Sequence, residues 1–293
     1  MARRRGSGPR RPVPKSRECL FCGSSGPLEK EHVFGDWLRK LGFSGEGWRE
    51  ITDESATPVS RIEQGGPFSK RLKIVCGPCN NEWMSSMEDG VKPLLVEMFN
   101  TVGKVKLDEP AQILFARWAF KTICVIDQLT PVRSKVPLAH CRELRRKDRP
   151  PRQTQIWIGT ATGDPHPQGK QLVEAAILPR EGTISMDGKS FRFNAYQARF
   201  RLINVVFDCF GYRFDRAMVE ESVDGELGRA LLPIWPPGHP ALWWPPVQSI
   251  DALGGVAALS KVPMRGIPSL GPLPIAQVDG YLGLGESDSL VTA

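Results

Sequence analysis

A glutamate and a histidine stand side by side in the segment KEHVFGDWL, which spans residues 30–38. A Cys-x-x-Cys pair precedes them, and a second pair, followed by two asparagines, lies in VCGPCNNEW at residues 75–83. Thiolates with this spacing are typical zinc ligands, while imidazole and carboxylate groups can transfer protons or hold a cation. The two segments are therefore predicted to fold together around metal.

The cysteine pairs suit a closed structural metal site with four thiolates in tetrahedral geometry. In an intracellular chain, paired motifs of this kind indicate metal rather than disulfides. Gly23 and Gly77 allow the tight backbone turns that such knuckles need. We therefore expect a structural Zn²⁺ ion bound by Cys19, Cys22, Cys76 and Cys79. The alternative is two reduced pairs without metal.

The order of these motifs resembles that of a known family. CLFCG, KEHVFGDWL and LKIVCGPCNNEWMSSMED, over roughly residues 17–90, are similar to the HNH (His-Me finger, ββα-metal) endonucleases of the four-cysteine type. The resemblance implies two strands and a helix that hold one divalent ion, while a separate zinc ion joins the ends. It also implies hydrolysis of phosphodiester bonds.

By position in this motif, His32 corresponds to the family's general base, which takes a proton from the attacking water. Glu31 corresponds to the acid that binds the catalytic ion, and Asn80 to the last ligand of the same ion. Oxygen ligands favour Mg²⁺ or Mn²⁺. The family's middle asparagine has no counterpart here, so Asn81 is a candidate substitute, and Glu88 can add an acid to the same helix face.

The positive charge of the chain is concentrated at its start. The first 17 residues contain no acid and account for the whole net charge of +7. A basic arm of this kind is expected to be disordered alone and to bind a phosphate backbone, although a solubilising tail is the alternative. Arg71 and Lys73, in KRLKIVC before the second knuckle, are also expected to contact phosphate. The arm's expected contacts are Arg3, Arg4, Arg5, Arg10 and Arg11.

The predicted fold class is α+β, with a ββα-metal HNH domain and its four-cysteine zinc site followed by a mixed helix and antiparallel-sheet domain. The expected divisions are a basic arm at 1–17, the nuclease domain at 18–100, an accessory domain at 101–262 and a loosely ordered tail at 263–293. From Gln153 onward, short alternating or apolar runs divided by Gly, Pro and Asp indicate strands.

Helical patterns precede these strands. Asp36 is expected to cap a short helix, a second helix is expected to stop at Gly90, and Asp108 is expected to cap a long core helix over 109–129. The segment 137–149 can place four arginines on one helix face, which suits either phosphate contact or a solvated surface. Asp187-Gly188 predicts a hairpin turn.

The sequence thus predicts a metal-dependent endonuclease that acts on nucleic acid, with double-stranded DNA favoured over RNA, in phage or mobile-element processing or in defence. No apolar run approaches the length that a membrane span requires, so we expect a cytoplasmic protein without one. A homodimer is possible. The first alternative is a zinc-stapled nucleic-acid-binding protein without catalysis. The second is a scaffold whose C-terminal domain performs the main task.

Overall fold

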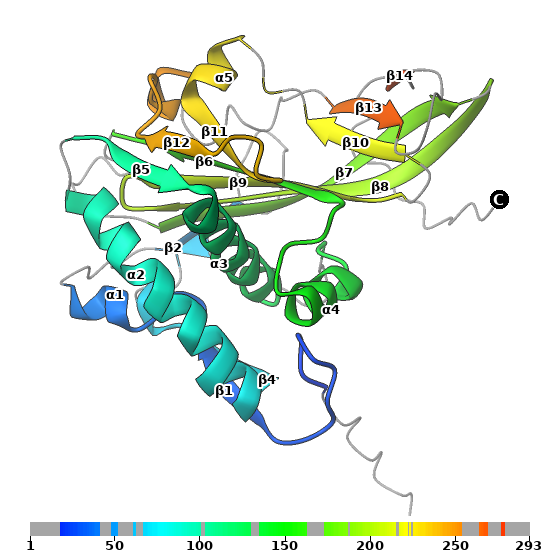
Figure 1. Cartoon of the computed structure of the whole chain (residues 1–293). Helices are drawn as coiled ribbons and strands as arrows, with labels where there is room; N and C mark the ends of the chain where they lie inside the picture. The colour runs from blue at the N-terminus through cyan, green and yellow to red at the C-terminus, as the bar shows by residue number, and fades with distance from the viewer. Residues whose placement is uncertain are drawn as a thin grey trace, which may run out of the picture.

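Figure 1 shows a computed structural model of the chain, in which the longer helices lie on one side of a large twisted sheet and the short helix α5 (Gly225–Ala230) lies on the other. The basic arm at 1–17, most of the insert at 42–66 and most of the tail at 263–293 lie outside the described residues. The predicted arginine contacts of the arm therefore stay predictions. The described residues are 18–41, 48–51, 61–62, 67–100, 103–129, 135–162, 173–186, 188–214, 217–221, 223, 225–253, 264–268 and 277–278.

The largest sheet has the strand order β11-β6-β9-β8-β7-β2-β3, and β14 pairs with β7. Its neighbouring strands are antiparallel except for β2 and β7, which run parallel. The β7–β8 hairpin turns at the expected place, where Gly188 has a φ of +73°. The strands are β2 (Trp48–Ile51), β3 (Arg61–Ile62), β6 (Thr154–Thr160), β7 (Val173–Met186), β8 (Lys189–Leu202), β9 (Val205–Arg213), β11 (Leu231–Trp235) and β14 (Gln277–Val278).

The long helix α3 (Glu109–Asp127) fills the centre of the fold. As predicted, Asp108 caps it, and its carboxylate accepts a hydrogen bond from the Ala111 backbone N–H at 3.0 Å. The Trp118 ring lies 5.8 Å from Phe200 of β8 and 5.6 Å from Phe207 of β9, measured between ring centroids. These aromatic contacts fix α3 on the sheet face.

A small hairpin and a helix lie beside α3. β1 (Leu28–His32) pairs antiparallel with β4 (Arg71–Cys76), with Leu28 opposite Cys76 and His32 opposite Arg71. The chain then forms a π-helical turn, η2 (Pro78–Met84), and continues into α2 (Ser85–Asn100). The two strands and the helix that follows them are therefore present in the predicted order.

The predicted stop at Gly90 is wrong, because α2 continues through it to Asn100. Gly90 lies where α2 packs against α3, and a Cβ added there would approach Leu114 Cδ2 to 3.3 Å. The glycine thus serves close helix packing rather than helix termination. Asp36 stands at the predicted N-cap position of the next helix, but its side chain accepts no hydrogen bond from a helix N–H and instead accepts from Arg39 at 3.1 Å.

Short elements complete the described chain. The helical ones are α1 (Trp37–Lys40), η1 (Pro67–Ser69), α4 (Leu138–Lys147), α5 (Gly225–Ala230) and η4 (Ile250–Leu253). Two further antiparallel pairs join β5 (Val105–Asp108) to β12 (Ala241–Trp244), and β10 (Ala217–Glu221) to β13 (Met264–Pro268). The molecule is thus a mixed α+β fold with antiparallel sheets, as the sequence predicts.

One hydrophobic core runs from the cysteine knuckles through α2 and α3 to the large sheet. Phe34, just after β1, lies 5.9 Å from Phe200 of β8 between ring centroids. Packing is therefore continuous across residue 100, where the sequence places a domain boundary, and that division stays a prediction. No helix in the part of the chain that the structure describes has the length and hydropathy to cross a membrane.

Candidate metal centre and active site

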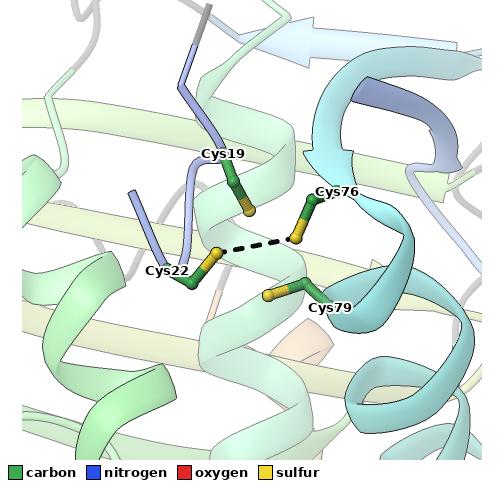
Figure 2. A group of neighbouring side chains, drawn as sticks. All are labelled: Cys19, Cys22, Cys76 and Cys79. Carbon is green, nitrogen blue, oxygen red and sulfur yellow. Dashed lines mark hydrogen bonds between the residues drawn. The ribbon is translucent and has the colours of Figure 1, made fainter. Parts of the chain in front are cut away.

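The cysteine pairs form a cluster at one end of the β1–β4 hairpin (Figure 2). Cys19 and Cys22 belong to the loop before β1, Cys76 ends β4, and Cys79 lies in η2. All four Sγ atoms lie within 4.8 Å of one another, and those of Cys22 and Cys76 are 3.5 Å apart. The structure therefore brings together the four predicted thiol ligands.

The cluster has the dimensions of a tetrahedral metal site. With Zn–S bonds of about 2.3 Å, tetrahedral sulfurs lie about 3.8 Å apart. A hydrogen bond with Cys79 lowers the pKa of Cys19 to about 4, and the same bond raises the pKa of Cys79. Four cysteines in this arrangement could bind a metal such as zinc.

Backbone geometry holds the first knuckle in place. The Leu20 N–H donates to the Ile74 carbonyl of β4 at 2.9 Å, so the knuckle extends the hairpin. Gly23 has a φ of +74°, a conformation that other residues adopt only with strain. The Phe21 ring also meets the Trp83 ring of η2 edge-on, with centroids 5.1 Å apart.

A buried group of charges lies behind β1. The Lys121 side chain of α3 has no solvent exposure, and its Nζ lies 2.8 Å from Glu88 Oε1 and 3.8 Å from Glu31 Oε1. Burial raises the pKa of Glu31 to about 7, and the Lys121 charge opposes this shift. Burial alone would lower the pKa of Lys121, but the two carboxylates raise it overall. Glu31 and Glu88, both predicted site residues, therefore meet at one ammonium group.

His32 ends β1 and is half-buried. The Arg71 Nε–H donates to His32 Nε2 at 2.7 Å, so this nitrogen acts as an acceptor and the neutral ring carries its proton on Nδ1. Burial and the Arg71 charge lower the pKa of His32, while Asp36 and Glu88 oppose that shift. The ring is therefore held in the neutral form that a general base requires.

Asn80 and Asn81 have a different partner from the one that the sequence indicates. Both side-chain amides donate to Glu29 Oε2, at 3.1 Å and 2.9 Å. Gly77 makes room for this carboxylate, because a Cβ there would lie 2.9 Å from Glu29 Oε1. The structure thus pairs Asn80 with Glu29 rather than with Glu31, and its role as a metal ligand stays a prediction.

The predicted phosphate contacts on β4 are accessible. Arg71 and Lys73 are both exposed, and Lys73 stands opposite the exposed Lys30 of β1. Because alternate residues of a strand point to opposite faces, these three cations lie on the same hairpin face as His32, while Glu31 points inward. Cross-strand like charges destabilise a sheet, so a bound anion would stabilise this face.

Three residues of the site escaped sequence reasoning. Lys121 stands in the apolar run WAFKTICVI, and a charge in such a run is a usable signal, because lysine is rarely fully buried without a partner. Glu29 and Asp36 carry no such signal. Glu29 meets the two asparagines because of the register of β1 on β4, and Asp36 approaches His32 because of the turn after β1.

Gly35 packs against Glu88 of the buried charge group, so a substitution at Gly35 tests how tightly this group is packed. A Cβ at this position would overlap Glu88 Oε2 and the Trp37 indole. Gly35→Ala is therefore expected to displace the Glu88 carboxylate and to lower the free energy of unfolding by about 1–3 kcal/mol. Urea denaturation measures the loss. Gly26→Ala is the matched control, because nothing lies within 4 Å of its added Cβ, and an equal loss there would contradict the packing argument.

Comparison of the chain with protein-family models, with curated proteins and with solved structures finds no match.

Proposed function

We propose that residues 18–100 form a zinc-stapled ββα-metal domain of the HNH type that hydrolyses phosphodiester bonds in nucleic acid, with double-stranded DNA the favoured substrate. The observation that carries this proposal is a neutral His32 on the outer face of β1, next to Glu31, whose carboxylate belongs to the Glu31–Glu88–Lys121 group on the inner face. The order of β1, β4 and α2, with cysteines flanking both strands, supports it further.

In this proposal, zinc is structural. Its four protein ligands leave no open position, so it would join the two ends of the hairpin without reaching a substrate. The site for a catalytic ion is separate. Glu31 and Glu88 supply carboxylate oxygens, which suit Mg²⁺ or Mn²⁺, and the bound ion would supply positive charge to stabilise the phosphorane-like transition state. Asn80 is not required as a ligand in this arrangement.

His32 would act as the general base. Its Nε2 lone pair now accepts the Arg71 hydrogen bond, so Arg71 must turn away before this nitrogen can take a proton from water. A phosphodiester is a stronger partner for guanidinium than a neutral imidazole, because the bond is charge-assisted at both ends and can be bidentate. Arg71 would thus bind the substrate phosphate and, by the same movement, release His32.

A plasmid-nicking assay with Mg²⁺ or Mn²⁺ tests this function. His32→Ala is expected to slow cleavage by about 10²- to 10⁴-fold, the usual contribution of a general base. His239→Ala is the matched control, because His239 is exposed and lies outside this site, before β12. Cleavage at the parent rate in His32→Ala would remove this residue from the mechanism.

A second candidate is a zinc-stapled nucleic-acid-binding protein without catalysis. It is favoured by Lys121, whose ammonium already pairs with the two carboxylates that a divalent ion would need. Intact plasmid and intact RNA with both metals, in a protein that still binds nucleic acid and contains zinc, would support this candidate and exclude hydrolysis.

A further inference from the structure

A basic groove lies between the first cysteine knuckle and α4. Its volume is about 720 Å³, within the range of pockets that hold ligands. Phe21 and Cys22 of the knuckle line one side, and Leu138, Arg142, Arg145 and Arg146 of α4 line the other. None of these residues belongs to the proposed hydrolytic site.

The groove is held open by contacts that fix α4 to the knuckle. Arg142 donates to Glu18 Oε2 at 2.6 Å, and its guanidinium covers Gly23. The Arg145 guanidinium lies over the Trp83 ring at 5.2 Å, and the Trp83 indole N–H donates to Asp148 at 2.9 Å. Two of the three arginines therefore build the walls, and the groove exists before any ligand binds.

Arg146 is the arginine left for a ligand. Its side chain is exposed, and no hydrogen bond or ion pair involves it among the residues that the structure describes. The one carboxylate on the groove wall, Glu143, is engaged by Lys147 at 2.6 Å. The charge of Arg146 is therefore not paired with the Glu143 carboxylate on the groove wall. Leu138 is 46% exposed and adds an apolar surface beside these cations.

We propose that this groove binds the sugar–phosphate backbone of a nucleic-acid strand. Arginine presents a planar fork of donors that matches phosphate oxygens, and apolar surface beside it suits the sugar. The inference goes beyond the proposed hydrolysis, because binding here needs neither His32 nor a divalent ion. From Leu28, opposite Cys76, to His32, β1 extends over about 13 Å, four steps of about 3.3 Å, which a nucleic-acid strand of a few nucleotides can span.

Fluorescence anisotropy with a labelled 20-base-pair duplex tests the groove in the full-length His32→Ala protein, in zinc-containing buffer without Mg²⁺. Arg146→Ala is expected to weaken binding about 3- to 8-fold at 0.1 M salt and to reduce the slope of log K against log salt by about 0.9, the loss of one phosphate contact. Arg146→Lys should restore most of the slope, because it restores the charge.

Arg192→Ala is the matched control, because it removes an exposed arginine from the β8 strand, where Arg192 pairs with Glu181. It should leave affinity and slope unchanged. Zinc content is measured in every variant, so that loss of the knuckle is not mistaken for loss of a contact.

Parental binding by Arg146→Ala, or an equal loss in Arg192→Ala, would overturn the proposal. Competition by polyglutamate as strong as by unlabelled duplex would also overturn it, since the groove would then select charge alone. Failure of cleavage in the plasmid assay leaves this result unaffected.

Discussion

Cys76→Ser is expected to lower bound zinc from about one equivalent per chain to a small fraction of that and to abolish cooperative unfolding of the N-terminal segment. Cys76 ends β4, and its sulfur lies 3.5 Å from that of Cys22, so it joins the knuckle to the hairpin. Structural zinc contributes about 10–16 kcal/mol in small zinc domains. That exceeds the net stability of many whole domains, so the loss should be large.

Elemental analysis measures the zinc, and circular dichroism with and without a chelator measures the unfolding. Cys209→Ala is the matched control, because Cys209 is also buried but lies in β9, outside the cluster. It should retain its zinc, and its free energy of unfolding should fall only by the amount expected for shortening a buried side chain. Full zinc occupancy in Cys76→Ser would mean that the four sulfurs do not form one metal site.

The metal cluster could be predicted from the sequence because its determinants are local. Each Cys-x-x-Cys pair places two thiols on one turn, so only a single long-range contact between the knuckles had to be assumed. The helix α3 was predictable for a similar reason, since its periodic apolar residues need only one surface to pack against.

The sheet topology depends on contacts that no local pattern records. β2, from the insert between the knuckles, runs parallel to β7, more than 100 residues later in the chain. The pairing of β1 with β4 decides where the insert lies, and therefore which strand β2 can reach. A strand as short as β2 has too few residues for its sequence pattern to specify a partner. The use of Gly90 for close packing against Leu114 of the neighbouring helix is likewise a long-range contact.

The candidate site was predictable in its residue types but not in its pairings. Glu31 and His32 are adjacent in sequence, yet one contacts Lys121 inside the fold and the other contacts Arg71 on the outer face. Their strand alternation separates them, whereas the motif suggested a shared site. The partner of Asn80 depends on the bulge between Glu29 and Lys30, which shifts the register of β1 on β4.

Lys121→Met is expected to lower the free energy of unfolding by about 3–5 kcal/mol. It keeps the volume of the side chain but leaves the Glu31 and Glu88 carboxylates without their buried counter-charge. Removing one partner of a buried ion pair is strongly destabilising, because the other charge stays buried without compensation. Combining it with Glu88→Gln should cost less than Lys121→Met alone, because a single carboxyl can then take up a proton. Lys106→Met, at an exposed position of β5, is the control and should change stability by no more than about 0.5 kcal/mol.

The same variant separates the two candidate functions. If Glu31 and Glu88 bind a divalent ion, Lys121 competes with that ion, so Mn²⁺ should stabilise Lys121→Met more than the parent protein. A concentration of 100 times the dissociation constant would restore about 2.7 kcal/mol in urea denaturation. Mn²⁺ that stabilises both proteins equally, or neither, would show that the carboxylates do not form a divalent-ion site. Lys121 would then be the permanent cation of this cluster, as the non-catalytic binding protein requires.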